Sequence, residues 1–126
     1  MSVRGLRGAT IAQANTAEAI RCATRELMLA LVAANPQLHP DDMASIIFTC
    51  TPDLTAEPPA RAVRDLGWGQ VALMCVTEMD TPAGLRYCIR VLIHWNTDKK
   101  AADIRHVYLH SAAQLRPDRA ATRAST

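Results

Sequence analysis

The chain has 126 residues, of which 49% are hydrophobic, and a formal net charge of +2 at pH 7. This length suits one domain with a single core, and so small a charge, with only one Phe, two Tyr and two Trp, gives no footprint for nucleic acid. The chain has no apolar run near the roughly 20 residues that cross a bilayer and no secretory signal, so we expect a cytoplasmic protein without a membrane partner.

The first predicted element is a strand over Val3 to Ala9. Its two arginines, Arg4 and Arg7, are three residues apart and therefore point to opposite faces of the strand. Gly5 and Gly8 flank Leu6-Arg7 and would let another backbone or a ligand come close, although glycine in a strand more often marks a bulge.

The clearest helix follows, from about Thr16 to Ala34, and we expect it to stop before Pro36. Asn15 or Thr16 can cap it, and its apolar residues recur at helical spacing. Such an apolar stripe is what a helix packed on a sheet shows, so the pattern predicts a structural role.

The middle of the chain predicts strands at Met43–Thr51, Gln70–Thr77 and Ile89–Thr97. Between the first two, a short helix begins at Pro58 or Pro59, where proline suits a first turn, and runs to Leu66 before Gly67. This helix carries Arg61 and Arg64.

We predict a last strand over Arg105 to Ser111. There His106, Tyr108 and His110 would share a polar face that meets water or a cleft. The segment after Arg116 has little to bury, so we expect one domain over residues 1–116 and a flexible tail over residues 117–126.

One stretch, C-V-T-E-M-D-T-P-A-G-L-R-Y-C-I-R from Cys75 to Arg90, brings a thiol, a carboxylate and a guanidinium to a connection between strands. It has two interpretations, an ordinary solvated loop or a small active site, because loops carry both. Cys75 and Glu78 are an odd number of residues apart, so both line one site only if the strand ends or bulges near Thr77.

The spacing of the cysteines and histidines, the absence of known motifs and the arginine content limit the kinds of functional site that the chain can have. The four cysteines are far apart without a C-x-x-C pair, so we expect free thiols, and the His106/His110 spacing lacks the supporting ligands of a metal site. The signatures of hydrolases, P-loop and dinucleotide-binding proteins are absent. Twelve of the fourteen basic residues are arginine, which suits a small dianion. The choice is between a dicarboxylate-binding module and an enzyme that works by positioning and electrostatics.

Several blocks resemble one family in order and spacing from about Val3 to Asp118. They are V-R-G-L-R-G-A-T, T-P-D-L, C-V-T-E-M-D-T-P-A-G-L-R-Y-C-I-R-V, I-R-H-V-Y-L and L-R-P-D. Together they resemble the monofunctional chorismate mutases of the trimeric pseudo-α/β-barrel class. The resemblance implies an α+β fold, a mixed sheet packed against one long and one short helix, with three subunits forming the barrel and active sites between neighbours.

The resemblance also implies conversion of chorismate to prephenate by an intramolecular Claisen rearrangement, without a cofactor or metal, on the way to phenylalanine and tyrosine. Arg90 is similar to the cation that faces the ether oxygen of the substrate, and Arg7 and Tyr108 to ligands of its carboxylates. Glu78 and Cys75 would meet the ring hydroxyl. The more peripheral residues of the implied cleft are Ala60, Arg61, Arg64 and Arg116.

Overall fold

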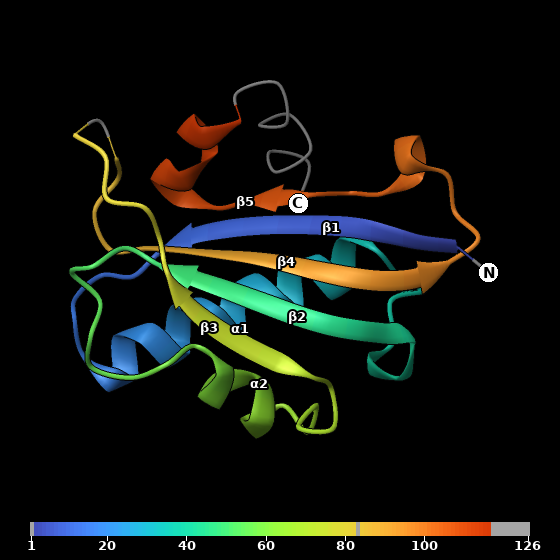
Figure 1. The fold of residues 1–126 in the computed structure, drawn as a ribbon, viewed down its shortest axis with the longest axis horizontal. Coiled ribbons are helices and arrows are strands. Elements are labelled where there is room, and N and C mark those ends of the chain that lie inside the picture. Colours follow the sequence, from blue (N-terminus) through green and yellow to red (C-terminus); the bar gives the residue numbers. More distant parts are fainter. Residues whose placement is uncertain (1, 83, 117–126) are drawn as a thin grey trace.

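The computed structural model describes residues 2–82 and 84–116 and contains a five-stranded mixed sheet with helices on one side (Figure 1). In chain order the elements are β1 (Ser2–Ile11), α1 (Ala17–Ala34), η1 (Pro40–Asp42), β2 (Met43–Cys50), α2 (Ala60–Asp65), β3 (Leu73–Thr77), β4 (Cys88–Thr97), η2 (Ala101–Asp103), β5 (Val107–Tyr108) and η3 (His110–Leu115). The predicted α+β class, with one long and one short helix, is confirmed.

The strands lie in the order β3-β2-β4-β1-β5. Strand β4 is antiparallel to both of its neighbours, β1 and β2, whereas the edge strands β3 and β5 are parallel to β2 and β1. The register places Leu6 and Ile46 beside Ile93, so strands that are distant in sequence align their apolar residues on one face.

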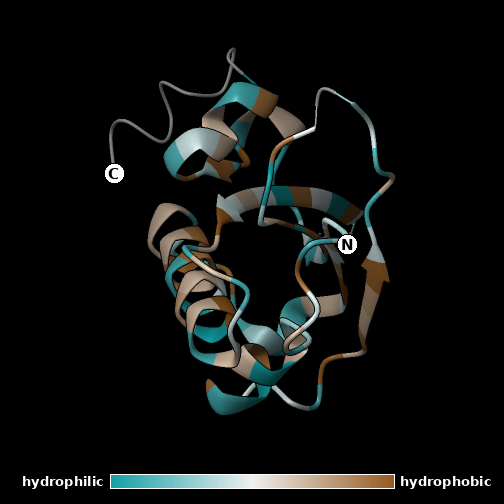
Figure 2. Cartoon of the chain, turned by 90° about the vertical axis from the view of Figure 1, so that its left-hand side faces the viewer, coloured by the Kyte–Doolittle hydropathy of each residue, from teal (hydrophilic) through white to brown (hydrophobic). Residues whose placement is uncertain are grey.

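That face is the core. In β4 every second residue from Ile89 to Thr97 is buried, which is the period-2 pattern of a strand with one covered side. Helix α1 contributes fully buried residues such as Leu27 and Leu31 to the same core. In Figure 2, hydrophobic and hydrophilic residues alternate along the helices and along the strand that crosses the top of the view, whereas β3, at the right, is mostly hydrophobic.

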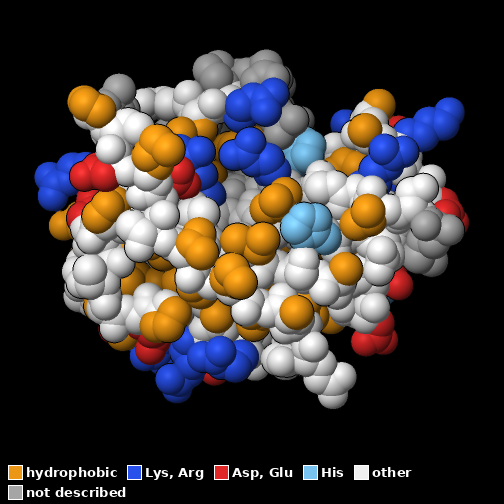
Figure 3. Space-filling model, viewed as in Figure 1, with side chains coloured by type: hydrophobic (Ala, Val, Ile, Leu, Met, Phe, Trp, Pro, Cys, Tyr) orange, Lys and Arg blue, Asp and Glu red, His pale blue; other side chains and the backbone are white. Residues whose placement is uncertain are grey.

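We call the opposite side of the sheet the open face. Neither α1 nor α2 covers it, and among the described residues η3 covers part of it at the β5 edge. Its side chains come from alternate strand positions that include Arg7, Ile47, Thr49, Met74, Val76, Arg90, Leu92 and His94. Figure 3 shows hydrophobic side chains gathered over the middle of this face, with histidine and basic side chains beside them. Met74 is 59% exposed and Val76 42%, a notable amount of apolar surface for strand residues.

Local signals fix both helices. The Thr16 hydroxyl accepts a hydrogen bond from the backbone N–H of Ala19 at 3.1 Å, as the predicted cap requires. Helix α2 ends before Gly67, whose φ of +87° is the left-handed conformation typical of a residue that follows a helix. Both predicted helices are therefore confirmed to within one or two residues.

Gly8 is the place where a close approach is needed. A Cβ there would lie 3.1 Å from Leu27 Cδ1, 3.1 Å from Leu31 Cδ1 and 3.2 Å from the carbonyl oxygen of Val107. The missing side chain lets α1 and β5 pack against β1, so the close neighbour is the protein's own core.

The predicted last strand is present but is much shorter than the expected Arg105 to Ser111. Strand β5 contains only Val107 and Tyr108, because His110, with φ +55°, turns the chain into η3. Tyr108 is fully buried in the single chain, packed with Ala9 and Ala112 under η3, and does not meet water there. The predicted tail over residues 117–126 lies outside the described residues.

Candidate active site

Three strands meet where β2 and β3 end and β4 begins, and they bring a hydroxyl, a carboxylate and a guanidinium together. The register pairs Thr49 of β2 with Arg90 of β4, so both side chains lie on the open face. Glu78 directly follows β3, and its backbone N–H donates to the carbonyl oxygen of Cys50 at 2.8 Å. This bond extends the ladder by one residue and keeps the Glu78 side chain beside the other two.

The carboxylate of Glu78 is shared. Its Oε1 accepts a hydrogen bond from the Thr49 hydroxyl at 2.7 Å and lies 3.4 Å from Arg90 Nε. The side chains of Arg90 and Glu78 are 31% and 23% exposed, so the two charges are partly shielded from water yet open to a ligand. A separation of 3.4 Å is longer than a well-formed charge-assisted hydrogen bond, which leaves the guanidinium free to bind a further anionic group.

Two other predicted residues lie beside this pair. Ala9 is paired with Arg90 on one side and with Tyr108 on the other, and Arg7 is two residues before Ala9 on the same face. Four predicted site residues, Arg7, Glu78, Arg90 and Tyr108, thus share one end of the open face.

The other predicted residues are elsewhere in the chain. Cys75 is exposed and pairs with Phe48, whose side chain belongs to the core, so the odd spacing from Glu78 does separate the two residues onto opposite faces. A shared site for Cys75 and Glu78 required β3 to end or bulge near Thr77. β3 does end there, but Glu78 still points to the side expected for the next residue of the strand, so the two side chains stay on opposite faces.

Helix α2 carries Ala60, Arg61 and Arg64 on the covered side of the sheet. Arg61 is 3.9 Å from a Glu57 oxygen and 3.5 Å from an Asp65 oxygen, whereas Arg64 is exposed. Arg116 lies at the end of η3. One chain therefore does not gather all nine predicted residues.

The start of β4, close to Arg90, is fixed by side-chain hydrogen bonds from the loop after β2, which the sequence did not predict. We call this set of bonds the clasp. The Asp53 carboxylate accepts hydrogen bonds from the backbone N–H of Tyr87 at 3.1 Å, and the Thr51 hydroxyl accepts one from Cys88 at 2.9 Å. Tyr87 has a φ of +53°, a strained angle that this clasp stabilises. The T-P-D-L block is thus explained by its contact with β4.

Nearby thiols are kept neutral. Burial, then the neighbouring Cys75, Cys88 and Asp53, raise the pKa of Cys50 to about 12. Burial also raises the pKa of Cys88, against the opposing effect of Arg90. Neither group is a thiolate nucleophile at neutral pH.

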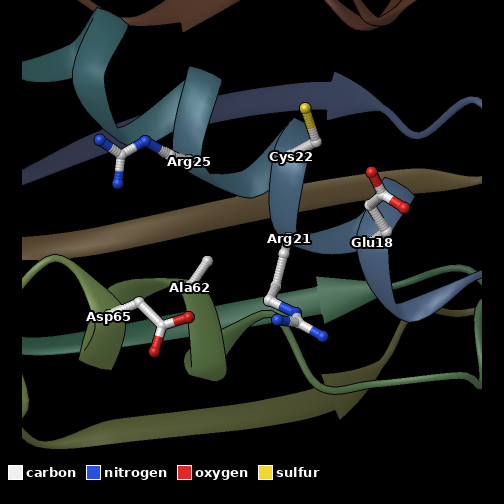
Figure 4. A pocket seen from close by; sticks show the side chains of 6 residues that line it. All are labelled: Glu18, Arg21, Cys22, Arg25, Ala62 and Asp65. Carbon is white, nitrogen blue, oxygen red and sulfur yellow. The ribbon is translucent and has the colours of Figure 1, made fainter.

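A pocket on the helical side of the sheet is separate from the cluster of Thr49, Glu78 and Arg90. It has a volume of about 440 Å³, lies between α1 and α2 and is lined by Glu18, Arg21, Cys22, Arg25, Ala62 and Asp65 (Figure 4). Its opposite charges are mixed, and none of its lining residues is a predicted ligand of the substrate. Within residues 2–82 and 84–116 no three His, Cys, Asp or Glu side chains are placed to hold a metal, and no helix is long and apolar enough to cross a membrane.

The fold and the cluster define a small α+β protein with a partly buried, charged site suited to a small anionic ligand. Comparisons with known proteins agree on the family. The chorismate mutase type I family model matches residues 3–119, and the chain therefore belongs to this family, whose members are isomerases.

Individual relatives cover almost the whole chain. The chain is 47% identical to chorismate mutase AroH of Thermus thermophilus over 92% of its length and 95% of that protein. It is 42% identical to chorismate mutase AroH of Bacillus subtilis over 98% of its length and 97% of that protein. A solved chorismate mutase from Clostridium thermocellum superposes with a TM-score of 0.85 at 48% identity, covering 88% of this chain and 98% of that one.

Proposed function

We propose that the protein rearranges chorismate to prephenate at the end of the open face, by positioning and electrostatic stabilisation alone. The observation that carries this proposal is the Glu78–Arg90 pair, whose charges are held at 3.4 Å by three strands without closing into a tight salt bridge. Such a site offers a fixed cation and a fixed hydrogen-bond acceptor without a nucleophile, which is what a rearrangement without covalent intermediates uses.

In this mechanism Arg90 faces the ether oxygen of chorismate. The C–O bond breaks ahead of C–C bond formation, so negative charge grows on that oxygen and a fixed cation stabilises the transition state more than the ground state. Arg7 and Tyr108 bind carboxylates of the substrate, and Glu78 accepts a hydrogen bond from its ring hydroxyl. Cys75 is on the opposite face of β3 from Glu78, so its contact with the same hydroxyl is a separate prediction, which protection of the thiol by a bound ligand tests. The domain that does this is residues 1–116, and residues 117–126 form its tail.

The rest of the site comes from a neighbouring subunit in a homotrimer. Two observations support this. The apolar open face exposes Met74 and Val76 in the single chain, and the predicted ligands on α2 are on the opposite side of the sheet from Arg90. Cyclic symmetry would bring Arg61 and Arg64 of one subunit to the strand ends of the next and repeat the site at each interface.

A direct assay on EDTA-treated protein tests the function. Chorismate should disappear, with prephenate formed in equal amount, far faster than in buffer. An unchanged rate would rule out the enzyme. A titration with chorismate beside the assay then separates a silent dicarboxylate-binding module, which still binds, from a protein with no affinity for it.

A further inference from the structure

The Thr49 hydroxyl has no role in the chemistry described so far, yet it makes the shortest polar contact of the Glu78 carboxylate. We infer that Thr49 is a positioning residue, which holds the Glu78 carboxylate in the orientation that binds substrate and keeps it from closing onto Arg90. This inference rests on the proposed function.

The two oxygens of the Glu78 carboxylate have different surroundings. Thr49 Oγ1 at 2.7 Å and Arg90 Nε at 3.4 Å both meet Oε1. In the described part of the chain Oε2 has no comparable contact, so it remains to accept a hydrogen bond from a ligand hydroxyl. A carboxylate fixed through one oxygen presents the other in a defined direction, which is the preorganisation that a binding site needs.

Thr49 is suited to this role because its own position is well determined. It lies between Val76 of β3 and Arg90 of β4 in the register, and a β-branched side chain on a strand has few χ1 rotamers. Glu78, by contrast, is next to Met79, which is 79% exposed, and the β3 strand has already ended. A donor with few rotamers thus orients a carboxylate that is carried on a longer side chain with more rotatable bonds.

The hydroxyl also limits the ion pair. Because Thr49 holds Oε1 at 2.7 Å, any movement of the carboxylate that brings Oε1 closer to Arg90 than 3.4 Å competes with this hydrogen bond. A tighter, two-oxygen pair would neutralise the guanidinium that the proposed mechanism needs for the ether oxygen. Loss of the hydroxyl should therefore weaken both the acceptor and the cation of the site.

The experiment compares Thr49→Val, which keeps the shape but removes the hydroxyl, with Thr49→Ser, which retains it. We expect kcat/KM for chorismate to fall about tenfold in Thr49→Val, as a lost hydrogen bond to a charged group predicts, and to stay near wild type in Thr49→Ser. Thr24→Val is the matched control, because it deletes another hydrogen-bonded threonine hydroxyl, which donates to the Ile20 carbonyl within α1, on the covered side of the sheet. It should change thermal stability without changing kcat/KM.

A double-mutant cycle then asks whether Thr49 acts through Glu78. In a Glu78→Ala background Thr49→Val should have no further effect, since the carboxylate that it orients is gone. An undiminished effect in that background, or wild-type kcat/KM in Thr49→Val, would overturn the inference. If wild-type protein is itself inactive, the proposed function fails instead.

A crystal structure of Thr49→Val provides a readout that does not depend on activity. The Glu78 carboxylate should turn toward Arg90 or occupy several rotamers. An unmoved, singly ordered carboxylate would show that the backbone of Glu78 alone sets its orientation and that the inference is wrong.

Discussion

Among single residues, the guanidinium of Arg90 has the largest expected effect on rate. Replacement of Arg90 by citrulline keeps the shape of the side chain and removes its charge. Losing one preorganised donor of this kind costs on the order of 10² to 10³ in kcat, and a full charge should cost at least that much. Steady-state kinetics of the semisynthetic protein measure the loss.

The matched variant Arg90→Lys restores a charge but not the planar fork that holds two acceptors, so it should remain far below wild type. Near-normal kcat with a raised KM in the citrulline protein would mean that Arg90 only binds a carboxylate. The catalytic cation would then have to be Arg7, the next arginine on the same face.

A second prediction at this scale concerns the thiols. At pH 8 iodoacetamide should label the exposed Cys22 and Cys75 and spare Cys50 and Cys88, whose pKa values are raised by burial. Saturating prephenate should slow labelling of Cys75 and leave Cys22, the internal control, unchanged. Mass spectrometry of peptides measures the labelling rate of each cysteine. If prephenate protects Cys75 and Cys22 equally, or protects neither, Cys75 does not belong to the ligand site.

The raised pKa of Cys50 also has a consequence for stability. The folded state keeps the thiol proton up to about pH 12, whereas the unfolded chain releases it near pH 9.0. The folded state therefore binds more protons between these values, so this thiol's stabilising contribution is complete below pH 9 and declines as pH rises toward 12.

Local periodicity assigns individual residues to strands and helices, whereas their roles in the site follow from the resemblance to the chorismate mutases. Arg7 and Arg90 could be assigned to strands from the pattern alone, and the structure places them on one face. Thr49 could not be found in this way, because its partner Glu78 is 29 residues away and the contact depends on the β2–β3 register. Tyr108 was assigned to a polar face because alternation ignores η3, which covers it.

At the scale of elements, the packing of β1 against α1 depends on Gly8. Gly8→Ala should lower the free energy of unfolding by about 1 to 3 kcal/mol, because the new methyl group overpacks two leucines and a backbone oxygen that cannot move aside. Gly5→Ala is the control on the same strand, since its Cβ would meet only Leu92 Cδ1 at an ordinary 3.5 Å. Thermal unfolding of both variants measures the difference, and equal melting temperatures would contradict this account.

The elements differ in how much of them a sequence can predict. Helix α1 is defined by its own residues: a capping threonine, an apolar stripe and a terminating Asn35-Pro36. Strand β5 is defined by a partner at the other end of the chain, since its two residues pair with Gly8 and Ala9. Its length follows from the positive φ of His110, which no pattern of hydrophobic residues encodes.

For the whole molecule, the open face and the divided set of ligands make assembly part of the proposed chemistry. Light scattering should give three times the 13.7 kDa of one chain. A monomer with full activity would contradict this, because the α2 residues would then have no way to join the strand ends.

Mixing defective subunits tests whether two chains build each site. Arg90→Ala damages the strand-end half, and an Arg61→Ala/Arg64→Ala double variant damages the α2 half, so each homotrimer should be nearly inactive. In an equal mixture, refolded together, about one quarter of the interfaces join two intact halves, and activity should recover to about a quarter of wild type. A mixture of Arg90→Ala with Arg7→Ala is the control: both changes damage the same half, no interface is intact, and no recovery is expected. If the first mixture shows only the mean of its parents, each site lies within a single chain.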